Sequence, residues 1–195
     1  MIIISTLHDP EGRLLSIVRL LKKELSTLNL IIAVTNNTDK NLVTFLLNLG
    51  IQIVDGGRYG ESRLSALRES LKRKKSFIFC CDFDKVLHWL LVDPKEFKNF
   101  LVCSLKEDFL ILGRTKKVFA TYPRSWKVTE SIINHLVSKI INSKVDVLTG
   151  VYIFQRIVGE VIVKEAIETS WGACVEWPLL AQFAGLEINY REVKG

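Results

Sequence analysis

Two aspartates separated by one residue, Asp82 and Asp84, follow the apolar run Ser76–Cys81 and are the clearest candidates for chemistry in this sequence. Side chains at positions i and i+2 of a strand share a face, so two carboxylates at this spacing repel one another. Mg²⁺ and Mn²⁺ prefer oxygen ligands and are held by carboxylates together with phosphate oxygens. The pair therefore predicts a Mg²⁺ or Mn²⁺ site for a diphosphate. The alternative is a solvated pair that caps the following turn.

Polar residues also follow the N-terminal apolar run. Thr6, His8 and Asp9 come at the point where that predicted strand ends and could contact a nucleobase or a ribose. A turn around Pro10 explains the same residues about as well, because proline and glycine commonly mark turns.

A glycine-rich loop is the third candidate. Gly56, Gly57 and Gly60 precede a helix whose first turn carries Arg63, and backbone N–H groups at such a helix start can bind a phosphate. Arg58 and Arg63 are the cationic groups best placed near a diphosphate. A plain connection that uses glycine for its positive φ angles is an equally good interpretation.

Glu176 lies between two tryptophans in the segment WGACVEWP. Apolar surroundings raise the pKa of a carboxyl group, which suits acid–base chemistry. The alternative is a residue in the first turn of a helix, stabilised there by the helix dipole.

An alternation of strand-like and helix-like segments must position these groups. The order predicts a doubly wound, mostly parallel α/β sheet in three layers, in which ligands bind beyond the carboxyl ends of the strands. The polar segments described above would then converge on one edge. The predicted strands are Ile2–Thr6, Leu30–Thr35, Ile51–Val54 and Ser76–Cys81, and the predicted helices are Leu14–Leu28, Leu42–Leu49 and Ser62–Arg73.

The second half is less regular, and no repeat or linker divides the chain. We predict one domain over residues 1–195, with a nucleotide-binding half (1–90) and an acceptor-side half (91–195). The segment Lys85–Leu91 is predicted as a helix or loop. Further predicted helices are Pro94–Phe100, Thr129–Ile141 and Glu176–Ala184; predicted strands are Phe109–Gly113 with Val118–Thr121 as a possible hairpin, Val145–Phe154 and Glu187–Tyr190.

The composition is that of a globular protein, with 48% hydrophobic residues and a net charge of +6. This charge suits an anionic ligand but is too small to indicate nucleic-acid binding. No apolar run approaches the roughly 20 residues of a membrane span. The first residues resemble a strand and lack the basic leader of a signal peptide. Four cysteines without a regular spacing are typical of reduced thiols, so we expect a cytoplasmic protein.

With strand, strand, glycine loop and DxD in that order, the chain resembles the GT-A fold of nucleotide-sugar-dependent glycosyltransferases, close to the family-2-like group. The resemblance rests on IIISTLHDPEGRLLSIVRLL, on GESRLSALRESL leading into FIFCCDFD, on VLTGVYIF and on WGACVEWP. It covers most of the chain in the order of its elements, and DFD is its most diagnostic motif. GRTKK and TYPRSWKVTE look like acceptor-side segments.

The resemblance implies a metal-dependent transfer of a sugar from a nucleotide-diphosphate sugar to an acceptor of unknown identity. Asp82 would lie near the ribose or the metal, and Asp84 would ligate the metal that stabilises the leaving nucleotide. Glu176 would be the general base, and Gly150 would lie beside the donor or acceptor sugar. The residues expected at the nucleotide are Thr6, His8, Asp9, Arg63 and Asp82.

Three other functions remain open at this point. One is a non-catalytic module that binds nucleotide sugars or regulates a partner on the same fold. A second is a sugar nucleotidyltransferase, a class that opens with a glycine-rich loop where this chain has only Gly12. The third is a DxD phosphatase with Asp82 as its nucleophile, a class whose motif normally opens the chain and is followed by Gly-Thr.

Overall fold

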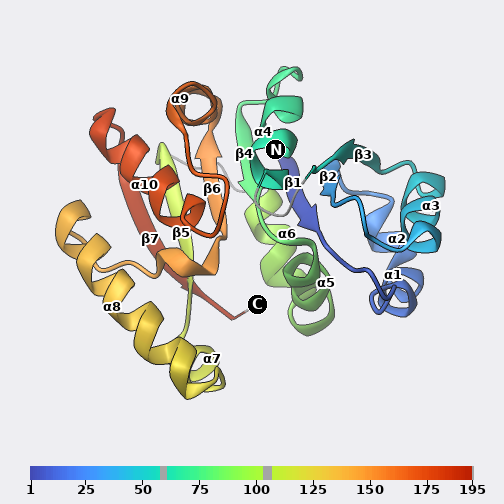
Figure 1. Ribbon diagram of the computed structural model, residues 1–195, viewed down its shortest axis with the longest axis horizontal. Helices are drawn as coiled ribbons and strands as arrows, with labels where there is room; N and C mark the ends of the chain where they lie inside the picture. Colours follow the sequence, from blue (N-terminus) through green and yellow to red (C-terminus); the bar gives the residue numbers. More distant parts are fainter. Residues whose placement is uncertain (58–60, 103–106, 195) are drawn as a thin grey trace.

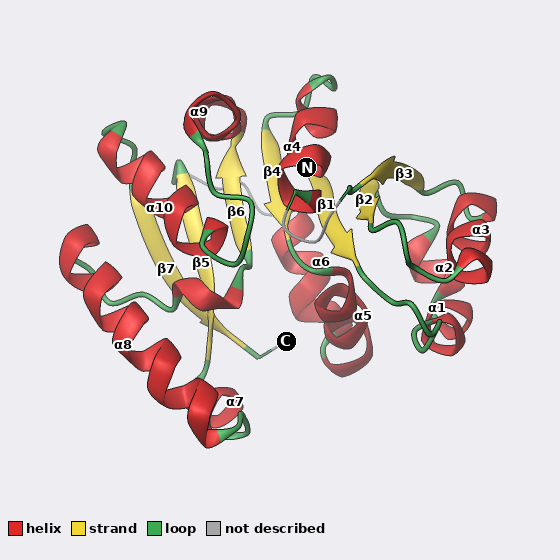
Figure 2. Ribbon diagram, viewed as in Figure 1, coloured by secondary structure: helices red, strands yellow, loops and turns green. Residues whose placement is uncertain are grey.

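A seven-stranded sheet runs through the computed structural model, which describes residues 1–57, 61–102 and 107–194 (Figures 1 and 2). The strand order is β3-β2-β1-β4-β6-β5-β7, and every neighbouring pair is parallel except the two that β6 makes. This confirms the predicted mostly parallel α/β fold. The strands are β1 (Ile2–Leu7), β2 (Leu30–Val34), β3 (Gln52–Asp55), β4 (Phe77–Cys80), β5 (Phe109–Arg114), β6 (Tyr152–Gln155) and β7 (Ile188–Val193).

Helices cover both faces of the sheet because the strands are apolar on both sides. In β1, Ile3 faces one hydrophobic core while Ile2 and Ile4 face the other, as the two-residue period of a strand requires. The first core contains α1 (Leu15–Leu20), α2 (Lys22–Leu25), α3 (Lys40–Asn48), α5 (Phe83–Val92) and α6 (Pro94–Val102). The second contains α4 (Ser62–Leu71), α8 (Arg124–Ile141), α9 (Arg156–Glu165) and α10 (Ala173–Phe183). None of the described helices is long and apolar enough to cross a membrane.

The order of the strands reverses between β1 and β4. From β1 the chain moves outward through β2 and β3, and then returns to form β4 on the other side of β1. Open α/β sheets bind ligands at such a switch point, outside the carboxyl ends of the strands. Because β6 is antiparallel to β4, the 3₁₀ helix η1 (Val147–Thr149) that precedes β6 lies at the same edge.

The predicted strand at Val118–Thr121 was wrong, and so was the hairpin. This segment begins within the helix α7 (Lys116–Ala120), which starts where the Thr115 hydroxyl accepts a hydrogen bond from the Val118 N–H. Strand β5 pairs instead with β6 and β7, which lie much later in the chain.

The predicted strand at Val145–Phe154 was too long. Gly150 has a φ of +63°, which ends η1 and keeps the preceding residues out of the sheet. Helix α9 follows β6 directly, in a segment for which no element was predicted. Its Val158 and Ile162, four residues apart, are both fully buried.

Helix α10 contains a proline, and the structure compensates for the hydrogen bond that this proline cannot make. Pro178 has no N–H to donate to the carbonyl of Cys174 one turn earlier. The hydroxyl of Tyr152 lies 2.8 Å from that carbonyl oxygen. This contact ties the first turn of α10 to β6, and it places the Cys174 side chain at the edge of the sheet described above.

Candidate functional site

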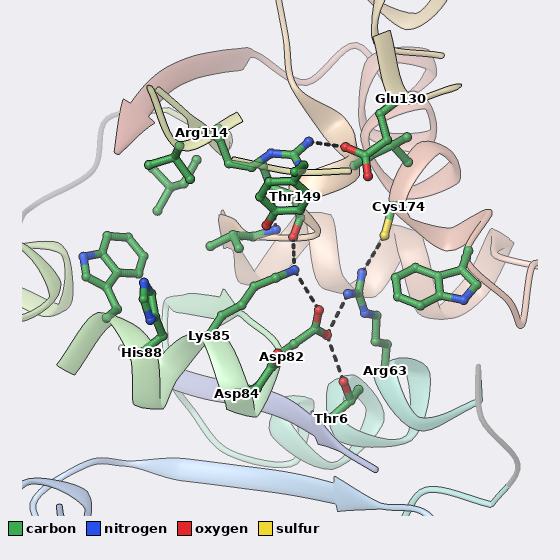
Figure 3. A pocket seen from close by; sticks show the side chains of 18 of the residues that line it. Thr6, Arg63, Asp82, Asp84, Lys85, His88, Arg114, Glu130, Thr149 and Cys174 are labelled. Carbon is green, nitrogen blue, oxygen red and sulfur yellow. Dashed lines mark hydrogen bonds and ion pairs between the residues drawn. The ribbon is translucent and has the colours of Figure 1, made fainter. Parts of the chain in front are cut away.

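A pocket of about 680 Å³ lies beyond the carboxyl ends of β1 and β4, at the switch point of the sheet (Figure 3). This volume is in the usual range of ligand pockets, about 300–1,000 Å³. The N-terminal half of the chain supplies Thr6, His8, Thr35, Arg63, Asp82 and Lys85 to the lining. The C-terminal half supplies Arg114, Tyr122, Trp126, Thr149, Trp171 and Cys174.

Asp82 connects several elements around this pocket. Its Oδ1 atom accepts hydrogen bonds from Arg63 Nη2 at 2.7 Å and from Thr6 Oγ1 at 2.9 Å. Its Oδ2 atom accepts one from Lys85 Nζ at 2.9 Å, and this ammonium also donates to the Thr149 carbonyl (Figure 3). One carboxylate therefore links β1, α4 and α5, and through Lys85 it reaches η1.

The ion pairs keep all three groups charged at neutral pH. Burial would raise the pKa of Asp82, but the charges of Arg63 and Lys85 outweigh it and hold this pKa well below its usual range. Burial would likewise lower the pKa of Lys85, and the Asp82 carboxylate raises it above its ordinary value instead. Two positive groups and one negative group leave the cluster with one net positive charge.

Arg63 is held against a glycine. A Cβ atom on Gly150 would lie 2.5 Å from Arg63 Nη2 and 2.8 Å from Nη1, far closer than such atoms can approach. The same guanidinium donates from Nη1 to the Sγ atom of Cys174 at 2.8 Å. Gly150 thus makes room for Arg63, in addition to its need for a positive φ. The resemblance placed a bound sugar beside Gly150, and the Arg63 guanidinium occupies the space next to this glycine.

Asp82 and Asp84 do not share a strand face. Strand β4 ends at Cys80, Asp82 is the N-cap residue of α5, and Asp84 belongs to the first turn of that helix. Two residues along a helix amount to a rotation of about 200°. Asp84 is exposed and lies at the edge of the pocket, while Lys85 is the residue that lies one turn after Asp82 and contacts it.

Asp82 is not available as a ligand of the predicted Mg²⁺ or Mn²⁺ ion in this geometry. Both oxygens of Asp82 are already bound by protein cations, and a metal ion there would have to displace Lys85 or Arg63 or lie close beside them. Over residues 1–57, 61–102 and 107–194, no group of three or more His, Cys, Asp or Glu side chains is arranged to hold a metal.

The three residues predicted after β1 have different surroundings. Thr6 and His8 line the pocket, and His8 Nδ1 lies 2.8 Å from Thr35 Oγ1 at the end of β2. Asp9 is buried, and its two oxygens accept hydrogen bonds from the backbone N–H groups of Arg13 and Leu14. These bonds favour the turn interpretation for Asp9.

Glu176 is not among the residues that line the pocket. It lies in the first turn of α10, and its carboxylate accepts hydrogen bonds from the backbone N–H groups of Ile167 and Glu168. The structure therefore does not bring Glu176 together with Asp82. Arg58 and Gly60, the other candidates near a diphosphate, lie outside the described residues.

A second ion cluster, on the opposite wall, was missed by sequence reasoning. Arg114 at the end of β5 contacts Asp146 at 2.8 Å and Glu130 at 2.5 Å, and its guanidinium lies 4.8 Å from the Phe119 ring and 4.7 Å from the Tyr122 ring. The one available signal was an arginine that ends a fully apolar strand, because a buried arginine needs carboxylate partners.

No protein-family model and no curated protein matches the sequence. Solved structures do match the fold. Glucosyl-3-phosphoglycerate synthase from Mycobacterium tuberculosis, in complex with Mn²⁺, UDP-glucose and phosphoglyceric acid, is 15% identical with a TM-score of 0.60; the match covers 97% of this chain and 68% of that one. A cytidylyltransferase from Leptospira borgpetersenii is 12% identical with a TM-score of 0.52, over 98% and 75% of the two chains. The chain has the nucleotide-sugar transferase fold. At these identities the likeness shows the fold alone.

Asp82→Asn should destabilise the protein, because it leaves Arg63 and Lys85 without their counter-charge. Breaking a fully buried pair costs about 3–5 kcal/mol, and we expect about 2–3 kcal/mol here because Lys85 is 32% exposed. The matched control Asp84→Asn changes an exposed carboxylate and should alter the free energy of unfolding by less than about 1 kcal/mol. Urea unfolding at pH 7 measures both. Equal losses in the two variants would contradict this role of Asp82.

The effect of Asp82 should also depend on pH. Its pKa is lower in the folded protein than the value of about 4 expected in the unfolded chain, so its stabilisation is present above that value and is lost as the pH falls toward the folded pKa. The difference in free energy of unfolding between wild type and Asp82→Asn should be constant from about pH 6 to pH 8 and should shrink below about pH 4. A difference that widens on acidification would refute the assignment.

Gly150→Ala should cost more stability than Gly185→Ala. Both glycines have positive φ angles, +63° and +74°, but nothing lies within 4 Å of a Cβ built on Gly185. Backbone strain alone should cost each variant about 1–2 kcal/mol. Displacement of Arg63 from Asp82 should add about 1–3 kcal/mol in Gly150→Ala only. Urea unfolding of the two variants gives the difference, and equal losses would show that Arg63 adjusts freely.

Proposed function

We propose that this chain is a glycosyltransferase of the GT-A type that uses a nucleotide-diphosphate sugar as its donor. The observation that carries the proposal is the net positive Arg63–Asp82–Lys85 cluster in a pocket at the switch point of the sheet. This is where doubly wound sheets bind nucleotides, and a diphosphate needs cationic neighbours. The fold shared with the glucosyl-3-phosphoglycerate synthase adds support.

The two halves of the pocket suit the two substrates. His8 and Thr35, at the ends of β1 and β2, would contact the nucleoside, and Arg63 and Lys85 would bind the diphosphate. The opposite wall carries aromatic side chains, including Trp126, that suit the acceptor or the sugar.

In the reaction, an acceptor oxygen bonds to the anomeric carbon while the bond from that carbon to the phosphate oxygen breaks, and the leaving nucleoside diphosphate takes the electron pair. Cationic groups held beside the diphosphate stabilise the negative charge that develops on it. Asp84 lines the pocket and Glu176 does not. We therefore favour Asp84 as the carboxylate that could accept the acceptor's proton.

Nucleotidyl transfer is the second candidate, because the cytidylyltransferase shares the fold. Such an enzyme joins a nucleoside triphosphate to a sugar phosphate and releases pyrophosphate. Release of a nucleoside diphosphate from a nucleotide sugar would support glycosyl transfer, and release of pyrophosphate would support this second candidate. Tight binding without either product would favour a non-catalytic binding module.

Calorimetric titration with a panel of nucleoside diphosphates and nucleotide sugars, with and without Mn²⁺, tests the binding step. At least one compound should bind, and His8→Ala should weaken it about 2- to 10-fold by removing one hydrogen bond. His135→Ala is the matched control, since His135 is exposed on α8 and does not line the pocket. If no compound binds in either condition, the proposed function is rejected.

A further inference from the structure

The proposed diphosphate site already contains two cationic side chains, Arg63 and Lys85. The exposed fractions of the Arg63 and Asp82 side chains are 11% and 17%, so this pair is largely withdrawn from water, while Lys85 is 32% exposed and borders the pocket. The Lys85 ammonium has three N–H donors, and two of them point to Asp82 and to the Thr149 carbonyl. One donor is left for a ligand in the pocket.

A divalent ion would compete with these contacts. Of the two predicted ligands, Asp82 already accepts three hydrogen bonds on its two oxygens, from Arg63, Lys85 and Thr6. A divalent ion within a few ångströms of two protein cations meets strong repulsion in a partly buried site. Asp84, the other half of the motif, lies in the first turn of α5, where it does not share the bonding of Asp82.

We infer that Lys85 binds the diphosphate directly and, with Arg63 beside it, takes the part of the divalent metal. Asp82 acts as a positioning residue, which holds the two cations at one side of the pocket. Taken by itself, the Arg63–Asp82–Lys85 cluster keeps a net positive charge, which favours an anion beside Lys85 over a metal ion at Asp82. This inference rests on the proposed function, since it describes how the same pocket holds the donor.

The test compares nucleoside diphosphate binding in excess EDTA with binding in Mn²⁺, by titration calorimetry on the full chain. The affinities of the wild type should agree within about twofold, because no metal bridges the ligand to the protein. Loss of binding in EDTA with recovery in Mn²⁺ would overturn the inference and would support the metal site expected from the sequence.

Lys85→Met removes the charge and keeps most of the side-chain length. In EDTA it should weaken nucleoside diphosphate binding about 10- to 100-fold, the usual range for a hydrogen bond to a charged group. It should also make binding respond to Mn²⁺, because one oxygen of Asp82 is then released. An affinity unchanged by Lys85→Met would overturn the inference.

Lys98→Met is the matched control, since Lys98 is exposed on α6 and does not line the pocket. Its affinity should equal that of the wild type. The melting temperature of each variant shows whether it is folded. Lys85→Gln provides a second neutral variant if Lys85→Met fails to fold, and the same loss is expected.

Inorganic pyrophosphate separates this inference from the proposed function. If pyrophosphate binds in EDTA through Lys85 while every nucleotide fails, the proposed function is rejected and the metal-free anion site stands. If nucleotides bind only with Mn²⁺, the proposed function stands and the inference is rejected. If neither kind of ligand binds, both are rejected.

Discussion

The carboxylate of Asp82 lies between two partly buried positive charges, and the arrangement of the pocket depends on these two ion pairs. Without it, Arg63 and Lys85 would repel one another in a partly buried site. Each bond to Asp82 comes from a different element: Thr6 from β1, Arg63 from α4 and Lys85 from α5. One side chain therefore determines how the start of two helices meets the end of a strand.

The antiparallel strand β6 extends this arrangement into the second half of the chain. Because β6 runs against β4, the segment before it arrives at the carboxyl edge of the sheet, where the Thr149 carbonyl accepts from Lys85 and Gly150 admits Arg63. The start of this segment is fixed by Asp146, which binds Arg114 at the end of β5. The Arg114 cluster therefore holds the start of this segment at Asp146, and the Asp82 cluster holds its end at Thr149.

Much of the fold could be predicted from the sequence because its signals are local. Apolar runs, helical spacing and glycines predicted the first four strands and the mostly parallel sheet, and the residues after β1 and β4 were expected at one edge. The bonding of the site was not predictable in this way. Arg63 meets Cys174 across 111 residues and Lys85 meets Thr149 across 64, and no local pattern records such pairs. The hairpin at Val118–Thr121 was wrong for the same reason, since the partners of β5 lie far along the chain, whereas the helix there begins at a local N-cap, Thr115.

The start of helix α5 at the DxD motif explains why its two carboxylates diverge. In a strand, Asp82 and Asp84 would point the same way, but here the helix begins at once, and positions three apart become neighbours on its surface. Lys85 lies three residues after Asp82, so the start of the helix brings its ammonium to this carboxylate and turns Asp84 away. Lys85 then supplies to Asp82 the positive charge that the sequence led us to expect from a metal ion. When a lysine directly follows such a motif and a helix starts at the first aspartate, the lysine ammonium therefore competes with a metal ion for the same carboxylate oxygen of that aspartate.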